Sequence, residues 1–345
     1  MSEQTRREFL YRTLPGAVVV GSGLSVLQPL VSFAADRQLP PAAAQRGYTA
    51  GKYALEIDGQ VAGWVQSVEG GQATSTVVAP NKVAPVKSLP GVKYADIIVN
   101  CGTGMSRNFY DWIKASFDKQ YSRKSGAVIA TDYNYKERSR MDWANALITE
   151  VGFPALDAAS KDAAKMTIKF SPETTRHVAT PAGGAAYTGS KQAVQKKWLP
   201  ANFRLQIAGL ESACTRVNKI EAITVRFPSA ADQPLGVSKV SGVPARLQAS
   251  NLVVTFPEAD AKPFYDWHES FVIKGNSGPG NEKSGTLAYL TPDIKEALFT
   301  LTFRGLGILK LTPEKVEAGS ENIRRVKAEM YCKDIGFAHT PTAWA

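Results

Sequence analysis

Apolar and polar residues alternate along several short stretches of this chain, and each such stretch predicts a half-buried β-strand. Tyr53–Gly59 and Phe203–Gly209 share one form, with an aromatic residue, Leu, Ile and Gly at matching positions. Asp96–Asn100 and Asn251–Thr255 are short β-branched runs, which also favour strands. Further alternating strands are expected at Met141–Ala146, Lys165–Phe170, Leu298–Phe303 and Val326–Tyr331.

Two segments have helical periodicity instead, and both begin with the tetrapeptide Phe-Tyr-Asp-Trp, at Phe109–Trp112 and Phe264–Trp267. Apolar residues spaced near 3.6 follow each copy, so each predicts one helix that packs its aromatic stripe on a sheet; a ligand cradle is the alternative. Ser106 and Asp260 are placed to cap the two helices, and Gly275 to end the second. With one tryptophan of a predicted strand, the expected core anchors are Phe109, Tyr110, Trp112, Trp143, Phe264, Trp267 and Phe271.

The same landmarks recur in the same order, which indicates an internal repeat. The second copy follows the first by 150 residues at the opening strand, 155 at the helix and 159 where Ser125–Asp132 matches Ser284–Thr291. Loop insertions into a duplicated domain produce such a slow drift. We therefore predict a mainly β (α+β) protein with two tandem units of barrel or sandwich type, residues 51–178 and 198–340, each with one principal helix. A Gly/Ala-rich linker, residues 179–197, joins them.

The N-terminal residues predict export. Thr5–Leu10 contains adjacent arginines followed by Phe-Leu, a weakly apolar stretch runs from Leu14 to Leu30, and Ser32-Phe-Ala34 offers small residues for cleavage. This pattern predicts a twin-arginine signal peptide over residues 1–34 and a spacer over 35–50, with the export machinery as a partner. The expected location is the periplasm, the cell surface or the extracellular medium. An ordinary basic N-terminus is the alternative, and prolines and glycines disfavour a membrane helix.

The net charge of +10 does not identify a partner, because the basic residues are spread along the chain. Nucleic-acid binding is not supported, and a basic surface would also suit contact with anionic polymers of the cell envelope. The three cysteines, Cys101, Cys214 and Cys332, do not form a disulfide framework. Cys214 and Cys332 could pair within the second unit, but we expect buried free thiols.

Known catalytic and cofactor motifs are absent from the sequence. The three histidines, His177, His268 and His339, have no zinc-binding spacing, and His268 is expected to be a half-buried packing residue. No nucleophile elbow, Walker loop or dinucleotide fingerprint occurs, and Gly102-Thr-Gly104 is expected to be a structural turn. We therefore expect no catalytic residue, metal or cofactor.

One acidic cluster leaves an enzymatic alternative open. Two carboxylates could flank a glycosidic bond, although basic residues lie among them and solvent-facing positions are expected. The cluster comprises Asp132, Glu137, Asp142 and Glu150. A hydrolase of envelope polysaccharide would use these side chains.

The first unit resembles the tail tube proteins of contractile-tailed bacteriophages and related contractile injection systems. The resemblance spans Gly51 to His177, and its most telling part is Leu89-Pro-Gly-Val-Lys-Tyr94 before a helix that carries Tyr110-Asp-Trp112. Gly63–Gly71, Arg123–Gly126 and Trp143–Ala146 add to it. The second unit resembles a degenerate copy that lacks the Leu-Pro-Gly-x-Lys-Tyr signature.

The resemblance implies a structural role. Proteins of that family form six-membered rings in which each subunit gives strands to a continuous inner β-barrel, with the helix outside, and the rings stack into a tube. It also implies that the loop corresponding to Gly70–Lys93 takes part in assembly. The residues expected in this assembly loop are Gly70, Gly71, Leu89, Pro90, Gly91, Lys93 and Tyr94.

These observations together predict an exported, non-enzymatic structural protein that forms rings or a hollow tube by self-association. Because each chain carries two units, a trimer would supply six units with pseudo-sixfold symmetry. A periplasmic ligand-binding or carrier protein is the first alternative, and the polysaccharide hydrolase is the second.

Overall fold

The computed structural model describes residues 51–75, 91–179, 198–227, 247–317 and 323–340. All of them fall within one compact unit, Tyr48–Ala345. The expected signal peptide, the spacer and nearly all of the expected linker lie outside the described residues.

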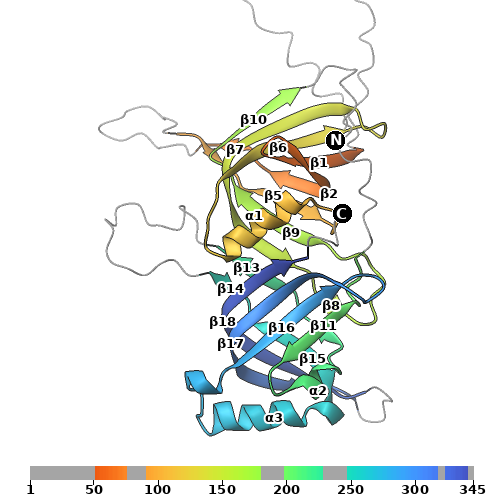
Figure 1. The fold of residues 1–345 in the computed structure, drawn as a ribbon, viewed down its shortest axis with the longest axis vertical. Helices are drawn as coiled ribbons and strands as arrows, with labels where there is room; N and C mark the ends of the chain where they lie inside the picture. The colour runs from red at the N-terminus through yellow and green to blue at the C-terminus, as the bar shows by residue number, and fades with distance from the viewer. Residues whose placement is uncertain (1–50, 76–90, 180–197, 228–246, 318–322, 341–345) are drawn as a thin grey trace, which may run out of the picture. The chain divides into compact units, whose positions relative to one another are not determined.

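Six antiparallel strands of the first unit close into a barrel, in which the order β7-β6-β1-β2-β5-β9 returns to β7 (Figure 1). They are β1 (Lys52–Ile57), β2 (Gln60–Gly70), β5 (Ile97–Cys101), β6 (Lys124–Thr131), β7 (Glu137–Phe153) and β9 (Met166–Ser171). Closure removes the free edges that an open sheet would expose. The expected fold class, mainly β with barrel-type units, is confirmed by this barrel and by the half-barrel that follows it.

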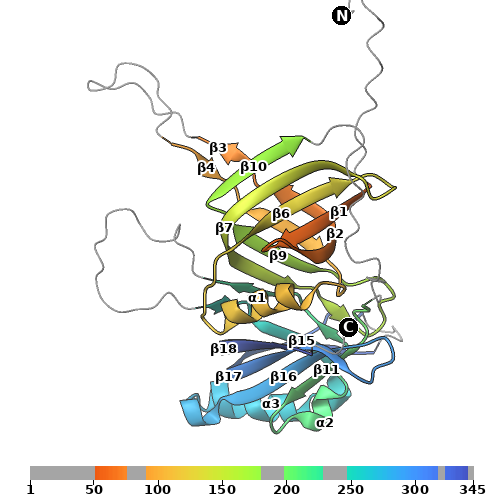
Figure 2. The same cartoon turned by 45° about the horizontal axis from the view of Figure 1, so that its top comes forward.

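Three further strands extend the barrel sheet beyond β7. They are β10 (Thr174–Ala179), β13 (Ile223–Arg226) and β14 (Gln248–Ala249). The strands β3 (Ala73–Thr74) and β4 (Lys93–Tyr94) form a separate two-stranded ladder, which Figure 2 shows apart from the barrel wall.

A second, open sheet has the order β11-β16-β17-β18-β15-β12-β8. Its strands are β8 (Leu156–Asp157), β11 (Phe203–Ile207), β12 (Lys219–Ile220), β15 (Leu252–Pro257), β16 (Lys283–Leu290), β17 (Ala297–Pro313) and β18 (Arg325–His339). All except β8 come from the second unit, so strand pairing joins the two units within one chain.

The two sheets share an order of strand pairing. The first unit runs β1-β6-β7-β9-β5-β2, and the second runs β11-β16-β17-β18-β15-β12. In the first unit β2 begins directly after the turn at Asp58-Gly59 and pairs with β1. In the second unit the short helix α2 (Glu211–Cys214) follows the corresponding turn, and β11 has no pairing with β12. The second sheet therefore stays open where the first one closes.

One principal helix follows the third barrel strand of the first unit, α1 (Arg107–Phe117) after β5, and the third open-sheet strand of the second unit, α3 (Lys262–His268) after β15. As expected, Ser106 caps α1, because its side chain accepts a hydrogen bond from the Phe109 backbone N–H. The expectation for Asp260 is wrong: this residue ends the 3₁₀ turn η3 (Glu258–Asp260), and Ala261 occupies the cap position. The turn leads directly into α3, and the Glu258 carbonyl accepts from the Ala261 N–H, so no side-chain cap forms.

The helix α3 continues into a π-helical turn, η4 (Glu269–Ile273), which the sequence did not predict. The left-handed Gly275, with φ +73°, follows two residues after its end. This is the conformation in which glycine terminates helices at little cost.

The seven aromatic side chains expected in the core are all buried. Trp112 stacks on Trp143 of β7, with ring centroids 5.9 Å apart and an interplanar angle of 7°. The Trp112 indole N–H also donates to the Ser122 carbonyl at 3.0 Å, which satisfies its polar atom inside the core. The core continues from the barrel into the open sheet, so the two units share one apolar interior.

The three cysteines are free, and Cys214 and Cys332 do not form the alternative disulfide. Burial raises the pKa of the Cys101 thiol to about 12 and that of the Cys214 thiol to about 11. Both side chains therefore behave as small apolar residues.

Candidate assembly surfaces

The strand β13 of the second unit pairs with the end of β7 in the first unit. The register runs from Ile223 opposite Phe153 to Arg226 opposite Glu150, and the Phe227 N–H extends it by donating to the Thr149 carbonyl at 2.8 Å. Arg226 also forms an ion pair with Glu150 at 2.9 Å. This pairing makes one continuous sheet from strands of both units.

A second pairing crosses the same junction. Leu156 of β8 lies opposite Ile220 of β12, and both side chains are buried. Beside them the Lys219 ammonium lies 3.3 Å from the Asp157 carboxylate. Short strands two residues long are weak by themselves, but here they continue a seven-stranded sheet.

The helix α1 packs on β18 of the open sheet. Phe117 stacks with Phe337 at a centroid distance of 5.5 Å, and Tyr110 lies 5.5 Å from the His339 ring. The His339 Nε2 atom lies 2.9 Å from a carboxylate oxygen of Asp111. One helix thus contacts both sheets, since its opposite side carries Trp112.

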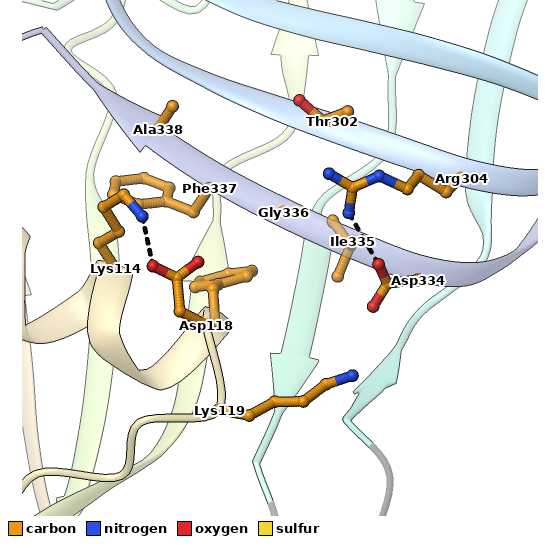
Figure 3. Close-up of a pocket in the computed structure, with 11 residues that line it drawn as sticks. Lys114, Asp118, Lys119, Thr302, Arg304, Asp334, Ile335, Gly336, Phe337 and Ala338 are labelled. Atoms are coloured by element: carbon orange, nitrogen blue, oxygen red, sulfur yellow. Dashed lines mark hydrogen bonds and ion pairs between the residues drawn. The ribbon is translucent and has the colours of Figure 1, made fainter.

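A groove of about 360 Å³ lies where the end of α1 meets β17 and β18 (Figure 3). Its charged side chains are largely paired with one another: Lys114 with Asp118, and Arg304 with Asp334, the latter at 2.8 Å. Lys119 also lines it. Paired charges leave few groups to hold a ligand, so the groove gives no specific support to a ligand-binding protein.

The expected assembly loop is described at its two ends. Gly70 ends β2 and Gly71 follows it, with φ of +88° and +77°, and a Cβ on Gly70 would lie 1.8 Å from the Asp96 carbonyl oxygen. A side chain at Gly70 is therefore excluded. Lys93 and Tyr94 form β4, which pairs with β3, whereas Leu89 and Pro90 lie outside the described residues.

The end of this loop is held to its beginning. The Ser75 hydroxyl donates to the Gly91 carbonyl at 2.6 Å, and the Thr74 hydroxyl donates to the Lys93 carbonyl at 3.2 Å. These bonds extend the two-residue ladder on its loop side. The hairpin β3–β4 is thus a defined element with exposed side chains at Ala73 and Thr74.

Three of the four carboxylates in the acidic cluster, Asp132, Asp142 and Glu150, lie in separate ion pairs. Hydrogen bonds from the Lys136 backbone and from Arg138 lower the pKa of Asp132. Burial acts to raise the pKa of Asp142, but hydrogen bonds from Arg140 and Arg176 outweigh it and the pKa is lowered. A glycosidase acid needs a raised pKa, so these two carboxylates have the opposite tuning. Glu150 is the ion-pair partner of Arg226 described above.

The histidines are also separated from one another. His177 is exposed on β10, His268 is half-buried on α3 as expected, and His339 contacts Asp111. The described residues contain no group of His, Cys, Asp or Glu side chains placed to hold a metal ion. Within the same residues, no helix is both long and apolar enough to span a bilayer.

Sequence reasoning missed the pairing of β13 with β7. The signal was present, since Ile223 and Val225 alternate with polar residues, but a four-residue strand is too short to be recognised by periodicity alone. It also missed that β10, β13 and β14 would attach to the first sheet.

Residues 49–176 match the model of the family described as T4-like virus tail tube protein gp19. This confirms the resemblance inferred from the sequence, and the first unit is a tail-tube-like unit. No curated protein matches the chain.

Solved structures similar to part of this chain include chains of contractile injection systems and Hcp1. A chain of the PVC sheath–tube complex, an extracellular contractile injection system in its extended state, is 18% identical; the match covers 40% of this chain and 95% of that one, with a TM-score of 0.35. A chain of the anti-feeding prophage tube-terminating cap is 16% identical, with 43% and 99% covered and a TM-score of 0.36. Hcp1 from Flavobacterium johnsoniae is 14% identical, with 37% and 96% covered and a TM-score of 0.28.

Proposed function

We propose that this chain is an exported, non-enzymatic structural protein that assembles into rings through two tail-tube-like units. One observation carries the proposal: the strand-pairing order of the family-matched barrel recurs in the second sheet. Recurrence of a whole pairing order, with one helix at the same place in each unit, favours a tandem duplication over two unrelated domains.

Local details at matching positions support the duplication. The turns after β1 and β11 both contain a left-handed glycine, Gly59 with φ +76° and Gly209 with φ +75°. The lysine that begins the strand after the helix reaches the same turn in each unit. Lys124 bonds the Asp58 carboxylate at 2.6 Å, and Lys283 bonds the Ala208 carbonyl at 3.1 Å.

The ring is proposed to contain three copies and therefore six units. Sheet pairing and helix packing already join the two units inside one chain, which is how neighbouring units of a ring would have to meet. If every unit contacts the next one through the same two different surfaces, the interface is heterologous. Such an interface produces a closed ring when the rotation from one unit to the next is one sixth of a turn. Stacking of rings into a tube is the further step.

The location is proposed to be the periplasm, the cell surface or the medium, reached by the twin-arginine route. The support is the Thr5–Leu10 pattern in the sequence. Replacing Arg6 and Arg7 by lysine in the full chain should keep the protein in the cytoplasm, measured by fractionation. Unchanged export of that variant would contradict this route.

Sedimentation of residues 35–345 tests the assembly. The proposal expects a species with three times the mass of one chain, or larger stacks, at micromolar concentration. A single monomeric species across the concentration range would contradict it.

A further inference from the structure

We propose that one copy of this protein docks on the next by inserting the β3–β4 hairpin of its first unit beside β17 in the second unit of the neighbour. The partner is a second copy of the chain, and the docking reproduces the junction between the two units within one chain. This inference rests on the proposed ring assembly and specifies the surfaces that build it.

The first step is that β3–β4 and β13–β14 are the same hairpin in the two units. In β3–β4, Ala73 pairs with Tyr94 and Thr74 with Lys93. In β13–β14, Val225 pairs with Ala249 and Arg226 with Gln248. Each hairpin joins the strand region after β2 or β12 to the one before β5 or β15.

The second step is that these two hairpins differ in what covers them. The strand β13 pairs with β7 over Glu150–Phe153. The ladder β3–β4 pairs with nothing else among the described strands. One hairpin has a docking strand within the chain, and its counterpart does not.

The third step is that the matching docking strand is also uncovered. The strand β7 corresponds to β17, and its partner β9 corresponds to β18. Val151 of β7 lies opposite Ile168 of β9, and Leu311 of β17 lies opposite Ala328 of β18. Residues of β7 therefore precede their counterparts in β17 by 160 positions. The strand β16 pairs with β17 only as far as Leu306, and within the described residues no strand lies on that edge of Lys310–Pro313.

The residues of β17 at the proposed docking position are more exposed than their counterparts in β7. Val151 and Phe153, which β13 covers, are buried. Their counterparts Leu311 and Pro313 are half-buried and exposed, and Leu309 beside them is 43% exposed. The equivalent register in the assembly places Ala73 opposite Leu311 and Thr74 opposite Lys310. Pro313 lacks an N–H, so we expect the new ladder to end before it.

The helices give an independent observation that points to the same neighbour. The α1 face that packs on β18 contains Tyr110, which is fully buried, and Phe117, which is 4% exposed. The repeated Phe-Tyr-Asp-Trp sequence places Tyr265 and Val272 at the same positions, where they are 39% and 43% exposed. Ile273, the next residue, is 70% exposed. The second helix thus exposes the face that the first helix buries.

The surface that would cover this face also belongs to the first unit of a neighbour. The end of β18 around Phe337 corresponds to β10 around His177. Phe337 pairs with β17, His177 pairs with β7, and their partners in these two strands are counterparts at the same offset of 160 positions. His177 is exposed and Val178 is 37% exposed. The two contacts are consistent in direction, because a neighbour's first unit supplies both the β3–β4 hairpin for β17 and the β10 surface for α3.

Cross-linking of two variants with one added cysteine each tests the strand contact, since the remaining Cys101 and Cys214 are buried. We would prepare Thr74→Cys and Lys310→Cys separately in a Cys332→Ser background, mix them and oxidise. Non-hydrogen-bonded pairs in an antiparallel ladder have Cα atoms about 4.5 Å apart. Such a distance permits a disulfide. The counterpart positions, Arg226 and Glu150, form such a pair, because the hydrogen bond from Phe227 to Thr149 lies one position further along.

We expect a covalent dimer in the mixture and none when Lys310→Cys is replaced by Lys333→Cys, an exposed control on β18. Sedimentation of the same samples separates two kinds of failure. Oligomers without the cross-link would overturn this docking mode while leaving the proposed ring in place. Monomers without the cross-link would overturn both.

A charge substitution tests the helix contact. Val272→Asp should weaken self-association by about tenfold or more, since it places an unpaired charge at the position where the first helix buries Phe117. Ile294→Asp is the matched control, because Ile294 is 54% exposed and lies in the turn before β17, at the opposite end of that strand from Lys310–Pro313. Equal association of the two variants would overturn the role of α3, and unchanged circular dichroism would show that both still fold.

Discussion

Asn145 in β7 and Gly305 in β17 occupy the same bulge in two different sheets, and both have a left-handed backbone, with φ of 53° and 65°. In the first unit Lys124 faces Ala146 while Gly126 faces Trp143. In the second, Lys283 faces Leu306 while Gly285 faces Phe303. One extra residue therefore enters each long strand at the same point. The two units share this β-bulge, as expected for a conserved structural feature of a strand.

Substitutions at Asn145 should report this strained backbone. Asn tolerates the left-handed region better than other non-glycine residues, whereas a β-branched residue does not. We expect Asn145→Val to lower the free energy of unfolding by about 1–3 kcal/mol. Asn145→Gly should stay within about 1 kcal/mol of the parent, since it loses only the side-chain bond to Glu173. Urea denaturation measures both, and a valine variant as stable as the parent would contradict the assignment.

The Trp112–Trp143 stack should be a main source of stability in the first unit. Trp112→Ala removes a buried ring and its hydrogen bond to Ser122, and should cost about 3–5 kcal/mol. Tyr133, which is 73% exposed, provides the aromatic control, and Tyr133→Ala should change stability by about 0.5 kcal/mol or less. Similar melting of the two variants would be incompatible with Trp112 as a core anchor.

The paired carboxylates predict loss of stability in acid. The folded-state pKa of Asp142 is lowered, so its contribution is present above the unfolded carboxyl pKa and is lost as pH falls through the folded pKa. We therefore expect Asp142→Asn to reduce stability at pH 7 and to differ less from the parent near pH 3. Denaturation at the two pH values measures this, and an equal difference at both would rule out the ion pairs as the cause.

The buried thiols predict slow cysteine chemistry. With pKa values of about 12 and 11, Cys101 and Cys214 stay protonated at pH 8, and only the thiolate reacts. A thiol-reactive dye should leave both unmodified in the folded protein and label all three cysteines in denaturant. Rapid labelling of Cys101 without denaturant would show that the barrel opens readily.

Much of the fold could be predicted from the sequence, because the long elements carry their own periodicity. The opening strands Tyr53–Gly59 and Phe203–Gly209 correspond to β1 and β11, and the two aromatic stripes lie on α1 and α3. The long strand β7 was predicted only over Met141–Ala146, because the bulge at Asn145 interrupts the alternation.

The pairing between units could not be predicted in this way. The strands β8, β12 and β14 have two residues each, which is too few to show a period, and their partners are distant in sequence. Long-range pairing depends on where the barrel brings the chain, which no local pattern records. The prediction for Asp260 failed for a local reason, because the 3₁₀ turn that precedes α3 displaced the expected cap.

Negative-stain imaging of residues 35–345 tests the central claim, assembly through two tail-tube-like units, most directly. We expect annular particles with six lobes, built from three chains, alone or stacked into tubes. Uniform small particles of single chains at micromolar concentration, or rings with an odd number of lobes, would contradict it.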